Sequence, residues 1–447
     1  MVLPGIYGDL FADAEMAAVF SDAATLQGML DFESALARDE AAEGIIPAEA
    51  APVIAQACRA DLYDMADIGR QTTLAGNPAI PMVKLLTAKV AEADKSAARW
   101  VHWGATSQDA IDTGRLIQCA AGLRLIEERI DRLAAILARD ADRHRATVMP
   151  GRTLLQHALP TTFGLKAAYW LDALIGHAAS LTRINPATPL QLGGAAGTLA
   201  SLGERGSALQ ERMTGFELAV PWHTTRQALV RMGAELGLLS GTLGKIARDV
   251  MLLMQTEVAE AFEPAETGKG GSSALPHKRN PVQLLAMAAI ATRTPGLVST
   301  LFAALPQEHE RAVGGWHAEW ETLPQLFTLT GAALNHAIAM LDRLEIDADR
   351  MRANLDITQG LVLSERIALA LGEKMPRIEA KSIVETACKR AVNEKKHLRD
   401  ILAHDPRVTI HLNAERLDTL FDPATYLGAS EAVIERVLAL YRLTFTG

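Results

Sequence analysis

The stretch Leu123–His144, LRLIEERIDRLAAILARDADRH, decides the fold class of this chain. Its apolar residues recur at spacings of three and four, which places one set of them on a single side of a helix: Leu125, Ile126, Ile130, Leu133, Ile136 and Leu137. Apolar patterns predict further long helices over four other stretches: Leu229–Phe262, Gln283–Ala304, Leu323–Leu344 and Ser430–Tyr441. No region shows the sustained apolar/polar alternation with hairpin turns that strands would give. The sequence therefore predicts an all-α fold.

The length of the chain suggests several domains. A chain of 447 residues, 49% of them hydrophobic and only 5% aromatic, is long for one domain and suits packed helices. We expect three helical domains over residues 1–110, 111–345 and 346–447, with the long helices in the central one. Because long helices with wide apolar faces must bury them against neighbours, we also expect a homo-oligomer.

Composition argues against several classes of protein. Cys58, Cys119 and Cys388 are few and widely spaced, which is typical of a reducing cytoplasm without disulfides. A net charge of -9 without basic clusters argues against nucleic acid. The chain shows no signal-peptide pattern, no apolar run of about 18 residues and no metal-binding motif. We expect a cytoplasmic protein without membrane, nucleic-acid, metal or cofactor partners.

The stretch Gly268–Pro281, GKGGSSALPHKRNP, gives the strongest indication of function. Its glycines let the backbone approach a ligand closely, and four side chains add hydroxyl, amide and ammonium groups: Ser272, Ser273, Lys278 and Asn280. The stretch lies in a window of 41 residues, 267–307, that holds none of the 53 acidic residues of the chain. A Gly/Ser linker is the alternative, but the ALPHKRNP that follows is too specific for a spacer. An acid-free window in an acidic chain favours binding of a polyanionic small molecule.

Two further segments allow both a structural and a ligand-binding interpretation. In His102–Asp109 (HWGATSQD), Thr106 and Asp109 have the spacing of a capping box. The N–H groups at such a helix start also bind anions. The segment Gln191–Thr198 (QLGGAAGT) fits close helix packing through small residues as well as it fits a turn that contacts a ligand.

Two other segments would pass as structural if they stood alone. In Gly151–Gly164 (GRTLLQHALPTTFG), a lone His157 beside a proline turn is usually a buried, hydrogen-bonded residue. In Gln307–Trp320 (QEHERAVGGWHAEW), the cluster around Arg311 is usually a solvated helix face.

Together these motifs resemble the fumarase/aspartase superfamily, whose signature loop reads G-S-S-x-M-P-x-K-x-N-P. This chain departs from that loop only at Leu275. The resemblance implies three helical domains with a central five-helix bundle. It also implies that four copies form a twenty-helix core in a homotetramer, with active sites that combine segments of three subunits.

The resemblance also implies roles for individual residues. Ser272 would transfer a proton at the carbon next to a carboxylate, although the sequence itself does not decide between Ser272 and Ser273 as the base. Lys278 and Asn280 would stabilise the dianion that forms. The substrate-binding candidates are His102, Thr106, Ser107, Arg152, Thr153, Gln156, His157, Thr198, Ser273 and Arg311.

A departure from the superfamily pattern at Leu154 reduces the number of reactions that fit this chain. The superfamily places a His there as a general acid, and amine or guanidine leaving groups need such an acid. A carboxylate leaves unaided, because its conjugate acid has a pKa of about 4. If that carboxylate stays attached to the same molecule, the elimination opens a lactone and the reverse reaction closes one. The branch of the superfamily that does this acts on a small tricarboxylate, which suits the acid-free window.

Bulky residues argue against a nucleotide substrate. Adenylosuccinate lyases use a Ser and an Arg to hold a phosphate in the segment where this chain has Trp316, His317 and Trp320. We therefore expect a cofactor-free, lactone-forming isomerase. The alternatives are an amine-expelling lyase similar to adenylosuccinate lyase, in which His157 supplies the acid, and a non-enzymatic binding protein on the same scaffold.

Overall fold

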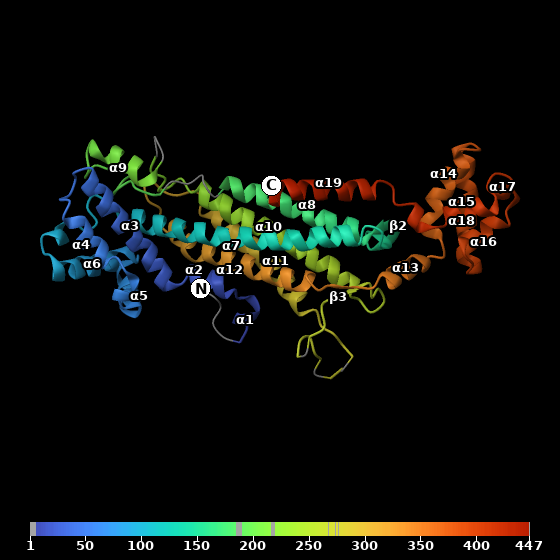
Figure 1. Ribbon diagram of the computed structural model, residues 1–447, viewed down its shortest axis with the longest axis horizontal. Coiled ribbons are helices and arrows are strands. Elements are labelled where there is room, and N and C mark those ends of the chain that lie inside the picture. Colours follow the sequence, from blue (N-terminus) through green and yellow to red (C-terminus); the bar gives the residue numbers. More distant parts are fainter. Residues whose placement is uncertain are drawn as a thin grey trace. The chain divides into compact units, whose positions relative to one another are not determined.

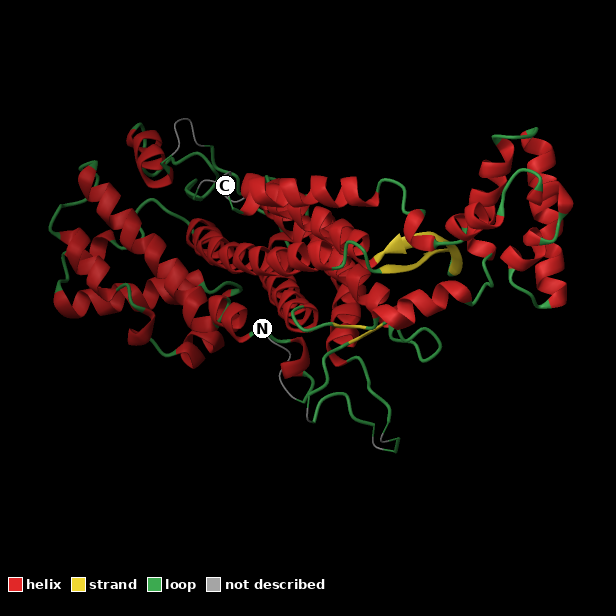
Figure 2. Ribbon diagram, turned by 45° about the vertical axis from the view of Figure 1, so that its right-hand side comes forward, coloured by secondary structure: helices red, strands yellow, loops and turns green. Residues whose placement is uncertain are grey.

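The protein is described by a computed structural model that covers residues 6–184, 190–215, 220–266, 268–272, 274–275 and 277–446. Helices dominate this part of the chain, and Figure 2 shows them in red beside short yellow strands. The predicted all-α fold is confirmed. Two small antiparallel sheets of two strands each are an addition that the sequence pattern did not indicate.

The chain forms two compact units. The first takes in Met1–Arg129, His177–Gly244 and Ala286–Asn335, and the second takes in Ile130–Gly176, Lys245–Leu285 and His336–Gly447. Five helices of 22 residues or more have residues in both units: α7 (Ser107–Arg143), α8 (Phe163–Ile184), α10 (Gln227–Leu253), α11 (Val282–Ala303) and α12 (Gly315–Leu341). The division into three domains stays a prediction.

Helices shorter than α7 precede it in the first unit: α1 (Gly8–Phe11), α2 (Ala14–Val19), α3 (Asp22–Ala42), α4 (Ala50–Ala57), η1 (Ala60–Leu62), α5 (Met65–Ala75), α6 (Ala79–Ala93) and η2 (Ala97–Trp100). Side-chain caps define several of their starts. The Ser21 hydroxyl accepts the Ala24 N–H at 3.2 Å at the start of α3. Figure 1 shows α3, α4 and α6 together in blue, and their apolar residues share one core with residues after α8 and with Trp316.

The long helices of the first unit pack through small residues. A Cβ on Gly28 of α3 would lie 2.9 Å from the Gly114 carbonyl oxygen of α7, so these two backbones touch. On α10, Cβ atoms at Gly233 and Gly237 would overlap side chains of α11, at 2.2 Å from Leu301 and 2.5 Å from Val298. The predicted helical stripe of α7 is buried except at Leu125, which is half-buried. Helix α9 (Arg205–Thr214) also belongs to this unit.

One predicted helix was too long. We expected a helix to continue to Phe262, but α10 ends at Leu253. Ala259 has a left-handed backbone (φ 53°), and the chain then enters strand β3 (Ala261–Phe262), which pairs with β4 (Glu345–Ile346). The reason lies at Glu260, which is fully buried and forms side-chain hydrogen bonds with Arg152 and Asn354.

A β-hairpin follows α7 in the second unit. Strands β1 (Val148–Thr153) and β2 (Gln156–Thr162) pair antiparallel and are drawn in yellow in Figure 2. Thr153 lies opposite Gln156. Pro150 lies opposite Pro160, and the register shifts between Pro150 and Arg152. Two prolines and a bulge obscure the alternation that would identify strands in a sequence.

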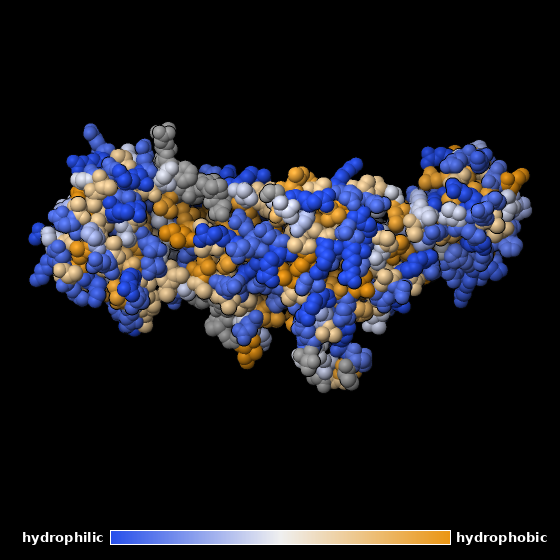
Figure 3. Space-filling model, in the orientation of Figure 1, coloured by the Kyte–Doolittle hydropathy of each residue, from blue (hydrophilic) through white to orange (hydrophobic). Residues whose placement is uncertain are grey.

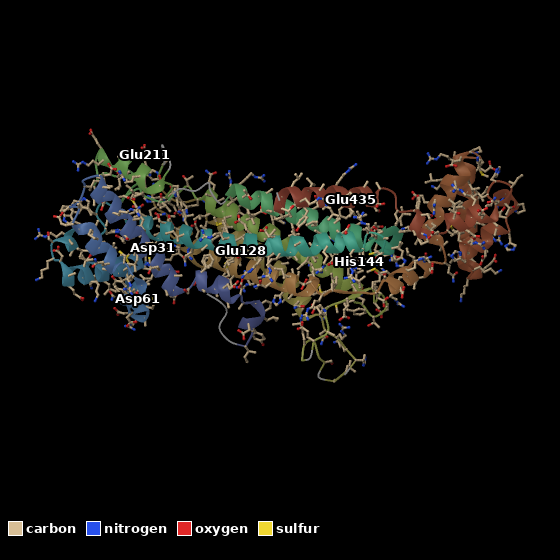
Figure 4. The ribbon with its side chains drawn as sticks, viewed as in Figure 1. Asp31, Asp61, Glu128, His144, Glu211 and Glu435 are labelled. Atoms are coloured by element: carbon tan, nitrogen blue, oxygen red, sulfur yellow. The ribbon has the colours of Figure 1, made fainter. Side chains whose placement is uncertain are left out.

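The C-terminal part of the second unit is helical, with α13 (Ala348–Asp356), η3 (Leu361–Leu363), α14 (Ser364–Gly372), α15 (Arg377–Glu394), α16 (Leu398–Ala403), α17 (Pro406–Thr409), α18 (Ala414–Leu420), η4 (Pro423–Thr425) and α19 (Ser430–Phe445). Apolar residues of α14 to α18 form a core of their own. Figure 4 labels Glu435 on α19 and His144 directly after α7. Arg145 pairs with Glu435 at 2.8 Å, which joins α19 to the end of α7.

Among the described residues, α11 is the one helix that is long and apolar enough to cross a membrane. Only the length and composition of α11 suggest that it could span a membrane, and the core helix of a bundle has the same length and composition. The contacts of Gly233 and Gly237 with α11 fit a bundle helix.

Candidate functional site

The predicted site residues lie in both compact units and form one group in each. In the first unit, the group centres on the start of α7. The Thr106 N–H donates to Asp109 Oδ2 at 3.0 Å, and the Asp109 N–H donates to the Thr106 carbonyl at 2.9 Å. The capping interpretation of this segment is therefore correct for the backbone of Thr106. Its hydroxyl has a different partner.

That partner is Arg311. The guanidinium donates to Thr106 Oγ1 at 3.0 Å, to the Gln108 side-chain oxygen at 3.1 Å and to the Ala195 carbonyl at 3.2 Å. Arg311 thus joins the start of α7 to the turn that contains Ala195, and it places a positive charge beside the Thr106 hydroxyl. A hydroxyl and a guanidinium this close together are suited to binding a carboxylate.

Asp109 joins three segments in this unit. Its buried carboxylate accepts the N–H groups of Gly193 at 2.9 Å and Gly194 at 3.0 Å, and lies 2.8 Å from His223 Nε2. A Cβ on Gly193 would come within 2.8 Å of the His223 ring, so only glycine fits there. The small residue at Gly193 therefore serves close packing, but against the turn at His223 and not between helices as one interpretation of Gln191–Thr198 had it.

Three other predicted residues surround this arrangement. Ser107 is the first residue of α7 and is half-buried, whereas Thr198 is exposed. Neither side chain has a hydrogen bond within the part of the chain that the structure describes. The His102 ring lies against Glu33, with Nδ1 2.6 Å from Oε1, and His102 has a left-handed backbone (φ 59°).

A buried ionic network lies beneath the start of α7. Arg226 is 2% exposed and hydrogen-bonds both Asp112 and Glu319. Trp316 donates its indole N–H to Asp112 at 3.0 Å, and Gln108 donates its amide to the same carboxylate at 3.1 Å. The pKa of Glu319 is raised because burial outweighs its bonds to Arg226. Through Gln108 the network reaches Arg311, so core packing holds the guanidinium in place.

In the second unit, hairpin β1–β2 carries four of the predicted residues. Thr153 and Gln156 are exposed on either side of the turn, and the two turn residues, Leu154 and Leu155, are 97% and 75% exposed. Both leucines have left-handed backbones, with φ of 49° and 64°. Such turns ordinarily carry Asn or Gly, so two exposed leucines store strain at the tip of the hairpin.

The other two hairpin residues lie deeper. Both terminal nitrogens of Arg152 bond the buried carboxylate of Glu260, at 2.9 and 2.6 Å. His157 is half-buried, and burial together with the nearby Arg152 charge lowers the pKa of its imidazole. Its Nδ1 is buried without a hydrogen-bond partner among the described residues.

The signature loop of the second unit closes on itself through Asn280. The Asn280 N–H donates to the Gly270 carbonyl at 2.8 Å, and its side-chain amide donates to the Gly271 carbonyl at 3.3 Å. Gly270 has φ 68°, and a Cβ there would lie 2.5 Å from the Asn280 carbonyl oxygen. Gly270, directly before the motif, and the motif residue Asn280 are therefore needed for the shape of the loop.

Ser272 lies inside this loop and is half-buried. Its Oγ accepts the Leu275 N–H at 3.1 Å and, more weakly, the Ala274 N–H at 3.4 Å. These donors favour negative charge on Oγ. Lys278 is exposed, without an ion-pair partner among the described residues, whereas Ser273 lies outside the residues that the structure describes.

The other cations of the acid-free window have partners. Lys269 lies 3.6 Å from Glu266, Arg279 pairs with Glu345 at 3.1 Å, and Arg293 bonds Gln325. Lys278 is thus the window cation best placed to meet an anionic ligand. Among the described residues, no group of three or more His, Cys, Asp or Glu side chains is arranged to hold a metal ion.

The sequence did not identify Glu33, His223 or Arg226 as parts of this arrangement. Each lies far along the chain from the start of α7, and only folding brings them there. The one signal that sequence could have offered is the spacing of Asp109 and Asp112, three residues apart at the start of α7, where both carboxylates are buried.

The chain is similar to known proteins over its whole length. A family described as lyase matches residues 11–296, and one described as adenylosuccinate lyase C-terminus matches residues 360–437. A 3-carboxy-cis,cis-muconate cycloisomerase of Pseudomonas aeruginosa is 52% identical over 97% of this chain and 96% of its own length.

Two further known proteins are similar to this chain over nearly its full length. The crystal structure of a 3-carboxy-cis,cis-muconate lactonizing enzyme from Pseudomonas putida matches with a TM-score of 0.94 and 46% identity, over 99% of this chain and 100% of that chain. A nitrosuccinate lyase of Streptomyces davaonensis is 41% identical over 97% of this chain and 94% of its own length.

Proposed function

Since this chain belongs to the lyase family, within the fumarase/aspartase superfamily, we propose that it interconverts 3-carboxy-cis,cis-muconate and 4-carboxymuconolactone. The cycloisomerase from Pseudomonas aeruginosa, 52% identical over nearly the full length, supports this reaction. The single observation within this chain that carries the proposal is Leu154, which stands where the superfamily has a general acid. A carboxylate is the nucleophile when the ring closes and the leaving group when it opens, and as a leaving group it needs no acid.

The proton transfer falls to Ser272. In the ring-closing direction, a carboxylate oxygen of the muconate adds to a carbon of the diene, and the electron pair moves into the neighbouring carboxylate. The Ser272 hydroxyl then delivers its proton to the carbon next to that carboxylate, and the alkoxide that is left takes up a proton from water. In the opening direction the Ser272 alkoxide removes this proton, and the ring C–O bond breaks. The N–H groups of Leu275 and Ala274 support the charge on Oγ.

The intermediate carries extra negative charge on the reacting carboxylate. Lys278 and Arg311 supply positive charge, and Asn280 supplies an amide. The remaining carboxylates are held by hydroxyl, amide and imidazole groups: His102, Thr106, Ser107, Thr153, Gln156, His157, Thr198 and Ser273. Because Arg152 is bonded to Glu260, its contribution is to hold the hairpin that carries Thr153 and Gln156.

The working form is a homotetramer in the cytoplasm with active sites shared between subunits. Exposed apolar side chains on the long helices support association, among them Leu238 on α10 at 63% and Phe302 on α11 at 53% exposed. Figure 3 shows apolar surface in orange between polar patches on the drawn face of the long helices. The strained, exposed Leu154–Leu155 turn fits a role in contact with a second copy. Three free cysteines, two of them buried, fit a reducing compartment.

A second reaction type deserves a parallel assay. The match of residues 360–437 to the adenylosuccinate lyase C-terminus keeps C–N cleavage open. The nitrosuccinate lyase relative, 41% identical to this chain, points to an elimination from another substituted succinate. Cleavage of adenylosuccinate would instead require an acid from another residue, with His157 as the candidate.

Ultraviolet spectroscopy tests the proposal directly. We expect the diene absorbance of 3-carboxy-cis,cis-muconate to disappear on mixing with the purified protein, with the lactone as the product. Adenylosuccinate and nitrosuccinate, run in parallel, should stay intact. No loss of the diene absorbance, with cleavage of either succinate instead, would contradict the cycloisomerase and assign the chain to a C–N lyase.

A further inference from the structure

A carboxylate from a distant helix holds the imidazole at the start of the first-unit group. Glu33 lies in the middle of α3 and is 1% exposed, and its Oε1 lies 2.6 Å from His102 Nδ1. The other oxygen, Oε2, is buried without a hydrogen-bond partner in the described ranges. Because a buried carboxylate is costly unless a charge compensates it, the pair favours a protonated ring.

The charged surroundings of His102 agree with this. Burial alone would lower the pKa of the imidazole, but the charge and hydrogen bond of Glu33, together with the charge of Asp109 on α7, raise it above its ordinary value. Glu40, two turns further along α3, is also buried, but burial and the nearby Glu33 charge raise its pKa to about 9, so at neutral pH it is uncharged. His223 and Arg311 lie on the segments that contact Asp109 and Thr106.

The backbone at His102 is also constrained. Its φ of 59° is unusual for a residue with a side chain, and Gly104, two residues on, has φ 73°. A Cβ on Gly104 would overlap Leu202 at 2.5 Å. Such local strain persists where the surrounding structure fixes it, and it is found most often at functional sites. The His102 side chain is 15% exposed, and its Nε2 has no partner among the described residues.

We propose that Glu33 is a positioning residue that fixes the His102 ring with Nδ1–H toward α3 and keeps it protonated, so that Nε2–H binds a substrate carboxylate beside Thr106 and Arg311. This inference rests on the proposed function, since it assigns one of the carboxylates of the tricarboxylate to His102. Glu33 itself does not touch the substrate.

The test compares Glu33→Gln with Glu40→Gln. Both residues are buried on α3, and both changes replace a carboxyl group by an amide of similar shape, but only Glu33 contacts His102. At pH 8 we expect Glu33→Gln to raise KM for 3-carboxy-cis,cis-muconate by about 10- to 100-fold, the effect of losing a charged hydrogen bond, with a smaller change in kcat. Lowering the pH to 6 should restore KM toward the wild-type value. Glu40→Gln should match the wild type throughout.

A second measurement does not depend on turnover. NMR titration of histidine-labelled protein, with the His102 signal assigned from His102→Gln, should show a lower His102 pKa in Glu33→Gln and no change in Glu40→Gln. Glu33→Asp keeps the negative charge but moves it away from His102, so the His102 pKa in this variant should lie between those of the wild type and Glu33→Gln. If Glu33→Gln leaves both the His102 titration and the pH profile unchanged, or if both Gln variants lose activity equally, the proposal is wrong. A wild-type protein without turnover would contradict the proposed function instead, while the titration would still decide the role of Glu33.

Discussion

Arg152 and Glu260 form a two-pronged ion pair that ties the β1–β2 hairpin to the segment after α10. The carboxylate is fully buried, and its oxygens lie 2.9 and 2.6 Å from the two terminal nitrogens of the guanidinium. Asn354 donates a further hydrogen bond to Glu260 at 2.7 Å. The pair therefore sets the position of Thr153 and Gln156 at the tip of the hairpin.

Breaking this pair should destabilise the protein. Arg152→Leu leaves a buried carboxylate with Asn354 as its remaining side-chain donor, which we expect to cost about 3 kcal/mol of unfolding free energy. Arg352→Leu, which breaks the exposed Arg352–Asp356 pair, is the control and should cost less than about 1 kcal/mol. Chemical denaturation of both variants measures the difference. Equal midpoints for the two would show that the buried pair does not hold the hairpin.

Ser272→Ala should remove the proton-transfer group while leaving the loop in place. We expect turnover to fall by about 10²- to 10⁴-fold, the usual contribution of a positioned acid–base group. The free energy of unfolding should stay within about 0.5 kcal/mol of the wild-type value, because Ser272 is half-buried in a loop. Ser273→Ala, measured in the same assay, should keep most of the activity. The opposite ranking of the two variants would assign the base to Ser273.

The shape of the loop can be tested through its glycines. Gly270→Ala should lower kcat/KM strongly, because the new Cβ would meet the Asn280 carbonyl oxygen at 2.5 Å in a left-handed backbone. Gly271→Ala is the matched control, since a Cβ at Gly271 meets nothing within 4 Å among the residues that the structure describes. Steady-state kinetics with both variants separates the effect of the clash with Asn280 from the effect of adding a methyl group to the loop. Similar activities would mean that the Gly270–Asn280 contact is not needed for catalysis.

Glu40 should make stability depend on pH. The folded state keeps its proton up to a pKa of about 9, whereas the unfolded chain releases it near the ordinary value of 4.5. Between these values unfolding releases a proton, so rising pH lowers stability, and the loss is complete above about pH 9. Glu40→Gln should therefore be more stable than the wild type at pH 8, by on the order of 1–3 kcal/mol, and equal to it near pH 4.5.

Thermal unfolding at several pH values measures this difference. The exposed Glu128 on α7, labelled in Figure 4, provides the control, because Glu128→Gln should follow the wild-type curve. A constant gap between Glu40→Gln and the wild type at all pH values would contradict a neutral Glu40.

The proposed tetramer should depend on the exposed apolar side chains of the long helices. Sedimentation of the wild type should give the mass of four 48.0 kDa chains. Leu238→Glu adds a charge at a position of α10 that is 63% exposed in one chain, and should shift the protein to smaller species. A charge added at the exposed Ile378 of α15, by Ile378→Glu, should leave the mass unchanged. A wild type that sediments as a monomer would contradict the shared active sites.

Much of the fold follows from the sequence because apolar residues recur with the helical period. The buried stripe of α7 is an example, since Ile126, Ile130 and Leu133 are all fully buried. The end of α10 and the hairpin were missed for a physical reason. Ala259 and Leu154 adopt left-handed backbones that local propensity disfavours, and tertiary contacts such as Arg152–Glu260 impose them.

The site was predictable where its residues are neighbours in the chain. The Ser272 loop and the start of α7 carry short motifs, and the resemblance to the superfamily that they indicated is confirmed by the comparisons. Glu33, Arg226 and His223 carry no such signal, because their importance comes from partners roughly seventy or more residues away. The roles of the predicted site residues stay predictions until the variants are measured.

The exposure of Leu154 also bears on how this scaffold evolves. Its side chain is 97% exposed in one chain, so replacing it disturbs no packing within the described residues, and a single base change converts the leucine codons CTT and CTC to codons for histidine. A lineage could therefore gain or lose an imidazole at this position with little loss of stability along the way. Switching between leaving groups that need an acid and those that do not is then a short mutational path, which would let one helical framework supply several catabolic routes.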